Sequence, residues 1–337
     1  MGSIAAPEYV SPEYMHCVRE PRFRQNVYEP EADTFLFLEA LDKDAELLRS
    51  LQPERCVEVG CGSGTVITHL RCLLLPHVVP AATEAVDSAK PVPSCRTRST
   101  RSAVGGPMFC AVDVNPVALE ASAITWTETL LKHFRTTVLT DFYDRLFQSP
   151  VPTSLAAPVV LSAEGSAPPS PHADAGAATS SSLSASTFCL HRFHGDLFGA
   201  LSRANSAPAL FDVILFNPPY VPTSLGELED AVSQQDLITT AWCGGPRGRV
   251  VLDRFLRQLP SVLSRRGVCY VVLIKENDVA DVAAFAQAAF REHLRDSGME
   301  AVGNEGAVLE ITEVAARYTG EHLSVHRLRY LPRFQTS

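Results

Sequence analysis

The sequence predicts an α/β fold built on a mostly parallel sheet of seven strands, of which the last is antiparallel. Short apolar runs alternate with segments of helical periodicity, the pattern of strands that are joined by crossover helices. The last two apolar runs have no helix between them and can form a hairpin. About 46% of the 337 residues are apolar, which is enough for a large core and excludes wholesale disorder.

Each expected element has a local reason. The strands are the apolar runs at residues 55–59, 108–113, 188–194, 211–216, 268–274, 307–315 and 323–331. Helices are expected at residues 34–48, 65–75, 116–134, 249–263 and 279–295. The first of these has apolar residues at helical spacing, and Asp33 or Thr34 can cap it. Asn115 followed by Pro116 favours a helix start, because the amide can cap and proline suits the first helical position.

Two stretches differ from the rest of the chain in composition. Residues 76–107 are rich in proline and small residues, and residues 149–186 consist mostly of alanine, serine, proline and threonine. Such segments bury too little apolar surface to offset the entropy lost on ordering, so both are interpreted as low-complexity insertions. The expected organisation is an N-terminal tail at residues 1–26 and one domain at residues 27–337 that carries both insertions.

Charge and cysteine content exclude several classes of protein. The net charge of −9 disfavours a primary role in gripping duplex nucleic acid. No apolar run is long enough to span a bilayer, and the N-terminus lacks the apolar region of a secretory signal. The nine cysteines contain no CxxC pair and the histidines show no metal-ligand spacing, so no metal is expected. A reduced intracellular setting fits best, the cytoplasm or also the nucleus.

A glycine loop follows the first predicted strand and leads into a helix. Gly60, Gly62 and Gly64 let the backbone approach a ligand, and a helix start favours an anionic group. The dinucleotide fingerprint needs its third glycine where Thr65 stands, and Glu58 precedes the loop. This combination resembles the first motif of class I methyltransferases, which are Rossmann-like and bind S-adenosylmethionine. The resemblance implies that Glu58 helps to hold the ammonium group of that cofactor.

Two aspartates end later strands. Asp113 can accept hydrogen bonds from both hydroxyls of a ribose. It lies 51 residues after Gly62, and removal of residues 76–106 leaves 20, which matches the usual spacing of about 20 and supports the first insertion. Asp196 can accept from an adenine amino group while the Leu197 backbone addresses the ring. A plain turn aspartate is an equally good interpretation of Asp196.

The most distinctive feature is Asn217-Pro218-Pro219-Tyr220, directly after an apolar strand. The prolines stiffen the turn and remove two amide donors, which leaves carbonyls free to accept. The Asn217 side-chain oxygen and the Pro218 carbonyl can hold the two N–H bonds of a planar NH2 group, as in glutamine or adenine. Held in this way beside the Tyr220 ring, the nitrogen of the NH2 group points at the methyl group that the cofactor would donate. The positive charge that develops on the nitrogen is then stabilised. Neither a metal nor a covalent nucleophile is needed; the alternative is an ordinary Asn-Pro turn.

Many segments together resemble the eukaryotic HemK-like glutamine methyltransferases. Residues 27–36, VYEPEADTFL, are similar to the VYEPAEDTFLL segment of that family. The resemblance continues at residues 58–64, 113–116, 195–197, 216–221, 241–245, 248–249, 251–255, 274–277 and 320–325. Nearly all of the chain outside the tail and the insertions is covered. One departure is Ala32, where the family usually has glutamate, with Glu31 one position earlier.

The resemblance implies a protein-glutamine N5-methyltransferase of translation termination. Its acceptor would be the glutamine in the Gly-Gly-Gln motif of the class I release factor, and its product S-adenosylhomocysteine. Residues that would contact S-adenosylmethionine are Thr34, Glu58, Gly60, Gly62, Gly64, Asp113, Asp196, Leu197 and Asn217. Asn217, Pro218, Pro219 and Tyr220 would contact the glutamine as the catalytic residues.

The resemblance also implies a heterodimer with a small zinc-binding activator subunit that adds to a sheet edge. We expect the strand at residues 188–194 to be this edge, with the second insertion flanking the interface. Trp242 with Gly244 and Gly245 could line the substrate entrance, although a core tryptophan is at least as well supported. Residues 275–277 are another candidate edge of the site, and a solvated strand terminus is the alternative.

Other functions stay open on the sequence alone. One is N6-adenine methylation of DNA or RNA; the net acidity and the lack of a basic domain weigh against it. Another is methylation of a different protein acceptor such as lysine. A third is a non-catalytic partner protein, against which the intact glycine loop, Asp113 and Asn217 argue.

Overall fold

The computed structural model describes residues 10–75, 107–134, 139–144, 189–201, 210–298 and 306–335. The expected insertion at residues 149–186 lies outside the described residues, as does the one at residues 76–107 except for its last position. No described helix has both the length and the apolar character that a membrane crossing requires.

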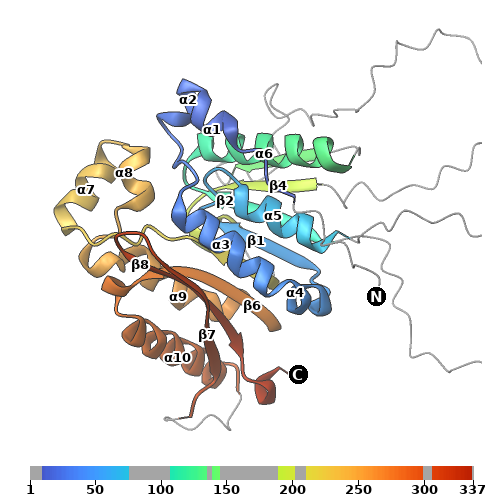
Figure 1. Cartoon of the computed structure of the whole chain (residues 1–337). Coiled ribbons are helices and arrows are strands. Elements are labelled where there is room, and N and C mark those ends of the chain that lie inside the picture. Colours follow the sequence, from blue (N-terminus) through green and yellow to red (C-terminus); the bar gives the residue numbers. More distant parts are fainter. Residues whose placement is uncertain are drawn as a thin grey trace, which may run out of the picture.

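A sheet of eight strands forms the centre of the described fold (Figure 1). The strands are β1 (Arg55–Val59), β2 (Met108–Asp113), β3 (Leu139–Asp144), β4 (Cys189–His194), β5 (Phe211–Phe216), β6 (Leu263–Ile274), β7 (Leu309–Tyr318) and β8 (His322–Tyr330). Their order is β3-β4-β2-β1-β5-β6-β8-β7. β1 to β6 are parallel, and β8 is antiparallel to its neighbours β6 and β7. The predicted fold class, a Rossmann-like α/β fold whose last strand is antiparallel, is confirmed.

Helices cover both faces of this sheet. One face carries α3 (Ala32–Lys43), α4 (Ala45–Leu51), α5 (Thr65–Leu74) and α6 (Pro116–Phe134), and the other carries α9 (Val250–Val262) and α10 (Val279–Asp296). Val57 and Val59 of β1 belong to the core beneath α9 and α10, whereas Cys56 belongs to the opposite core, because successive side chains of a strand alternate. β5 is buried at every position, as expected of a central strand covered on both faces.

The structure adds one strand to the seven that the sequence predicts. β3 pairs in parallel with β4, and its sequence LTDFYD contains no continuous apolar run that would indicate a strand. β4 therefore has a neighbour on each side, β2 and β3. The expectation that residues 188–194 form the sheet edge is wrong; β3 is the outermost strand at that end of the sheet.

The N-terminal part also differs from expectation. The helix expected at residues 34–48 is two helices, α3 and α4, and α3 begins at Ala32 with Glu31 in the cap position, so neither Asp33 nor Thr34 caps it. Within the expected tail lie α1 (Met15–Arg19) and α2 (Pro21–Arg24). They bury Cys17 and Phe23 against α6, which attaches this part of the tail to the fold.

A helical pair stands apart from the two layers (Figure 1). It consists of α7 (Leu225–Ser233) and α8 (Leu237–Trp242). α7 begins with a capping box, in which the Ser224 hydroxyl accepts from the Glu227 N–H and the Glu227 carboxylate accepts from the Ser224 N–H. Asp236 caps α8 in the same manner through the Thr239 N–H, at 3.0 Å.

Candidate active site

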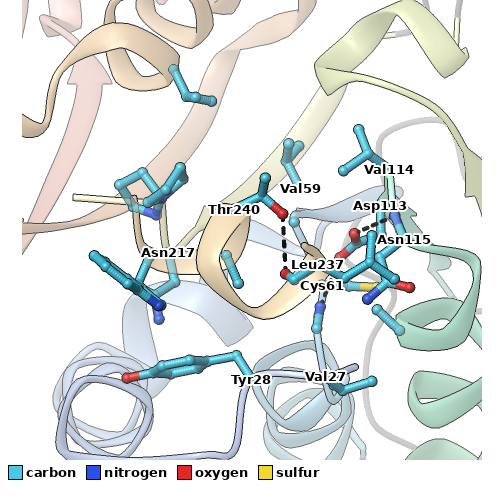
Figure 2. A pocket seen from close by; sticks show the side chains of 18 of the residues that line it. Val27, Tyr28, Val59, Cys61, Asp113, Val114, Asn115, Asn217, Leu237 and Thr240 are labelled. Carbon is cyan, nitrogen blue, oxygen red and sulfur yellow. Dashed lines mark hydrogen bonds between the residues drawn. The ribbon is translucent and has the colours of Figure 1, made fainter. Parts of the chain in front are cut away.

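A cavity of about 780 Å³ opens at the carboxyl ends of β1, β2, β4 and β5. The strand order changes direction between β1 and β5, and this switch point is where open α/β sheets bind ligands. The predicted site residues that line it are Thr34, Glu58, Gly60, Gly62, Asp113, Asp196, Leu197, Asn217, Pro218, Pro219 and Tyr220. Figure 2 shows Asp113 and Asn115 on one side and Asn217 on the other, with Leu237 and Thr240 between them in this view.

Asp113 fixes the glycine loop. Gly60 and Gly62 have φ of +62° and +49°, a conformation that favours glycine. The Gly62 N–H donates to Asp113 Oδ2 at 3.0 Å and the Asn115 N–H donates to Asp113 Oδ1 at 2.8 Å. Burial raises the pKa of Asp113, and these two hydrogen bonds oppose the rise. Each carboxylate oxygen can accept a further donor, which suits the two hydroxyls of a ribose.

Glu58 lies beneath the same loop and is almost fully buried. The Ile67 N–H in the first turn of α5 donates to Glu58 Oε2 at 2.9 Å. Burial raises the pKa of Glu58 well above its ordinary value, although the Ile67 hydrogen bond opposes the rise. The carboxyl group therefore borders the cavity and also fastens α5 to β1, a structural role that the sequence did not indicate.

Gly64 is absent from the described lining of the cavity. It is the cap residue of α5, with φ of +73°. A Cβ at this position would lie 2.5 Å from Cβ of Ser122 in α6. The structure gives Gly64 a packing role, the close approach of α5 and α6, and its predicted contact with the cofactor stays a prediction.

Asp196 and Leu197 lie on the turn that follows β4. The Asp196 carboxylate forms an ion pair with Arg254 of α9, and both side chains are about half exposed. Leu197 has φ of +47°, which is uncommon for a residue other than glycine. Both residues line the cavity, as predicted, but the Arg254 partner was missed because it lies 58 residues further along the chain.

The two polar atoms of the Asn217 side-chain amide differ in their hydrogen bonding. Its Nδ2 donates to Asp33 Oδ2 at 2.8 Å. Its Oδ1 is buried and receives no hydrogen bond from the residues that the structure describes. An unpaired buried carbonyl oxygen is costly, so this atom suits a ligand that brings an N–H donor. Burial, with a smaller contribution from the Asp33 carboxylate, raises the pKa of the nearby Tyr220 hydroxyl.

A buried asparagine hydrogen-bonds to the last residue of the NPPY loop, which comprises residues 217–220. Asn277 belongs to the short helix η4 (Lys275–Asn277). Its Nδ2 donates to the Tyr220 carbonyl at 2.8 Å and to the Arg247 carbonyl at 2.9 Å, and its Oδ1 accepts from the Ile274 N–H at 2.8 Å. Asn277 is fully buried. It is thus neither part of the cavity wall nor a solvated strand terminus, the two interpretations that the sequence allowed.

Trp242 and the glycines that follow it have different roles. Trp242 is 37% exposed and lines the cavity, which places it at the entrance and not in the core. A Cβ at Gly244 would lie 2.4 Å from the Pro219 carbonyl oxygen, and one at Gly245 would lie 2.7 Å from the Val250 side chain. The glycines permit close packing behind the NPPY loop.

Parts of the site were not indicated by the sequence. Asp33 is predicted only as a helix cap, yet it lines the cavity and bonds to Asn217. α7 and α8 were missed entirely, and they contribute lining residues such as Leu228, Val232 and Leu237. The capping box at Ser224 is the signal that could have located α7.

Comparisons with known proteins show what the chain is similar to. No family model matches the chain. The chain is 28% identical to mouse methyltransferase HEMK2 over 279 residues, which are 83% of this chain and 85% of that protein. It is 24% identical to the eRF1 methyltransferase catalytic subunit mtq2 of Schizosaccharomyces pombe, over 78% of this chain and 79% of that protein. Over most of its length the chain is therefore similar to HemK-like methyltransferases.

Two further similarities cover a shorter part of the chain or have a lower sequence identity. The chain is 41% identical to a putative protein N5-glutamine methyltransferase of Methanocaldococcus jannaschii, over 24% of this chain and 35% of that protein. It also resembles a chain in the structure of the E. cuniculi Mtq2–Trm112 complex, which methylates the eRF1 translation termination factor. The TM-score is 0.42 at 15% identity, and the match covers 90% of this chain and 99% of that chain.

The cavity fits S-adenosylmethionine, the cofactor that the sequence resemblance implies. The cofactor would bring two ribose hydroxyls, which match the acceptor capacity of Asp113, and a positive charge, which would favour the ionised form of the buried Glu58 and Asp113 carboxyl groups. Gly60 and Gly62 leave room for a ligand to contact the backbone, since a Cβ at Gly60 would approach Phe216 only to 3.8 Å and one at Gly62 would have no such neighbour within 4 Å. The cavity volume of about 780 Å³ is ordinary for a cofactor site. Among the described residues, no group of three or more His, Cys, Asp or Glu could hold a metal ion.

Asp113→Asn is expected to weaken S-adenosylmethionine binding by about 10- to 100-fold, because one charged acceptor is lost and an amide N–H faces a backbone donor instead. Isothermal titration calorimetry measures this change. Asp42→Asn is the matched control, since Asp42 of α3 pairs with His69 of α5 and does not line the cavity. Equal affinities of the two variants would contradict the role given to Asp113.

Proposed function

We propose that the chain transfers a methyl group from S-adenosylmethionine to the side-chain amide nitrogen of the glutamine in the Gly-Gly-Gln motif of the eukaryotic class I release factor. The observation that carries the proposal is the buried, unpaired Oδ1 of Asn217 in the wall of the cofactor cavity. The names of the relatives support the choice of protein substrate. The reaction is placed in the cytoplasm, where translation terminates, and residues 27–337 are taken as one methyltransferase domain.

Positioning of the amide is the main task of the loop. A primary amide has two N–H bonds in one plane, and the Asn217 Oδ1 and the Pro218 carbonyl are the two acceptors proposed for them. The Tyr220 ring offers a face against which the planar amide can stack. These contacts hold the nitrogen in line with the methyl group and avoid much of the entropic cost of a bimolecular encounter.

Charge stabilisation is the second task. When bound, S-adenosylmethionine supplies a methyl group on a positively charged sulfur. The amide nitrogen would form the new N–C bond as the S–CH3 bond breaks and leaves its electron pair on sulfur, which gives S-adenosylhomocysteine. The nitrogen would gain positive charge and release one of its two protons to water. Two oxygens aimed at the N–H bonds stabilise that developing charge, which is the kind of preorganised interaction that contributes most to catalysis. No residue of the loop has to act as a covalent nucleophile.

A second subunit is part of the proposal. The relative from Schizosaccharomyces pombe is named a catalytic subunit, which supports a heterodimer with a small zinc-binding activator protein. We place this partner on β3, since β3 is the outermost strand at its end of the sheet and has its second edge without a neighbouring strand of the described sheet. Pairing with that edge would satisfy the backbone groups of β3.

A labelling experiment tests the proposed function. The full chain, alone and with the activator, is incubated with methyl-labelled S-adenosylmethionine and with the release factor, the same factor carrying alanine in place of the glutamine, or a DNA duplex. We expect label only on the unaltered release factor, and mass spectrometry should place it on the glutamine side chain. Label on DNA and none on the release factor would support adenine as the acceptor and overturn the proposal; label on another protein side chain would overturn the choice of glutamine.

A further inference from the structure

We propose that Asp33 is the positioning residue that sets the orientation of the Asn217 amide and strengthens its oxygen as an acceptor. The inference rests on the proposed function in one respect, the N–H donor that Asn217 Oδ1 receives from the acceptor substrate. Asp33 would not touch the reacting atoms itself. It would act through Asn217, which does.

The geometry places Asp33 where it can do this. Asp33 lies in the first turn of α3 and is 3% exposed. Its Oδ2 accepts from Asn217 Nδ2 at 2.8 Å, and its Oδ1 accepts from the Tyr28 hydroxyl at 3.4 Å. The same carboxylate contributes to the raised pKa of the Tyr220 hydroxyl. Two donors from different segments of the chain therefore converge on one buried carboxylate.

The chemistry of a carboxylate decides which way the Asn217 amide points. An ionised carboxylate has only acceptors, and the start of a helix favours its negative charge. Only the NH2 end of the Asn217 amide can bond to it, since the opposite orientation would bring two oxygens together. Oδ1 must then be the atom left over for the ligand, and this is the atom that has no donor among the described residues. Without Asp33 the amide could rotate and present N–H donors, which would repel the N–H bonds of the substrate.

The same contact changes the strength of the Asn217 oxygen. A hydrogen bond to a charged acceptor is stronger than one between neutral groups, and hydrogen bonds in a chain polarise one another. Donation from Nδ2 to Asp33 shifts electron density of the amide toward Oδ1. An oxygen polarised in this way interacts most strongly with the N–H group when the substrate nitrogen becomes positive. Loss of the contact should therefore lower kcat more than it changes KM.

The first test compares single variants of the full chain. Asp33→Asn is expected to lower kcat by about 10- to 100-fold, the equivalent of one hydrogen bond to a charged group, with the affinity for S-adenosylmethionine changed less than kcat. Asp42→Asn is the matched control, because it makes the same chemical change on the same helix outside the cavity. A kcat for Asp33→Asn within twofold of the unaltered chain would overturn the inference.

The second test is a paired exchange that a merely structural role could not reproduce. Asn217→Asp alone sets a second carboxylate beside Asp33 and should abolish turnover. Combination with Asp33→Asn restores an N–H donor facing a carboxylate, and again leaves an oxygen facing the substrate. We expect the paired exchange to be at least ten times as active as Asn217→Asp alone; no recovery would contradict the positioning role.

A spectroscopic readout separates this inference from the proposed function. The side-chain NH2 signals of Asn217 in a 15N-labelled chain should move upfield in Asp33→Asn, because the bond to a charged acceptor is lost, and remain unchanged in Asp42→Asn. If the unaltered chain fails to methylate the release factor but this shift is seen, the proposed substrate is wrong and the positioning role stands. If methylation occurs and the signals do not move, the positioning role is wrong.

Discussion

Asn217→Ala is expected to lower the rate of methyl transfer by about 100- to 1000-fold, the loss typical when one preorganised hydrogen-bonding group is removed from an active site. The variant lacks the Oδ1 atom that accepts from the substrate N–H. Cofactor affinity should change far less, because Asp113, on the other side of the cavity from Asn217 (Figure 2), keeps its hydrogen bond from the glycine loop. Single-turnover kinetics with labelled S-adenosylmethionine measure transfer, and calorimetry measures cofactor affinity.

A control variant keeps this result specific. Gln25→Ala removes an exposed amide side chain outside the cavity and should transfer at the normal rate. Thermal unfolding of both variants checks that the fold is retained. Near-normal turnover by Asn217→Ala would refute the role of Asn217, and a parallel loss of cofactor binding would show that its contribution is to the cofactor site instead.

The sequence located most of the site because its residues sit at strand ends. Parallel strands bring their carboxyl ends to one edge of the sheet, so Glu58, Asp113, Asp196 and Asn217 had to meet once the strands were identified. The spacing of Asp113 from the glycine loop even indicated the first insertion. Such residues can be predicted because the backbone alone places them.

Residues that act through distant side-chain contacts could not be predicted in this way. Asp33 and Asn217 are 184 residues apart, and Asn277 meets the Tyr220 carbonyl across 57 residues. Their residue types also have common local explanations, a helix cap and a strand terminus. Gly64 illustrates the opposite case: its place in the glycine motif indicates a ligand contact and gives no sign that it also packs against Ser122 of α6. A motif indicates where the backbone must be unusual but not which neighbour requires it.

β3 was missed for a related reason. Apolar runs identify strands that are covered on both faces, and β3 is an outermost strand with the sequence LTDFYD. Its absence from the predicted set moved the expected sheet edge inward to β4. The edge proposed for the partner is therefore that of β3 and not that of β4. It stays at the same end of the sheet and is next to the second expected insertion in the sequence.

Gly248→Ala is expected to have the largest effect on the fold around the NPPY loop. Gly248 has φ of +66°, and a Cβ at this position would lie 1.8 Å from the Tyr220 carbonyl oxygen and 2.5 Å from Asn277 Nδ2. The methyl group cannot fit unless the loop moves and the hydrogen bond from Asn277 to Tyr220 breaks. Backbone strain and overpacking together should destabilise the chain by roughly 2–4 kcal/mol.

The Gly298→Ala variant separates the effect of backbone strain from the effect of steric overlap. Gly298 also has a positive φ, +76°, but no atom lies within 4 Å of a Cβ placed there. The variant should therefore lose stability only through backbone strain, by about 1 kcal/mol. Chemical denaturation of the two variants gives the difference, and their rates of methyl transfer show whether the NPPY loop has moved. We expect Gly248→Ala to lose transfer as well as stability and Gly298→Ala to retain transfer; equal destabilisation with normal transfer in both would mean that the contact between Gly248 and Tyr220 does not hold the loop in place.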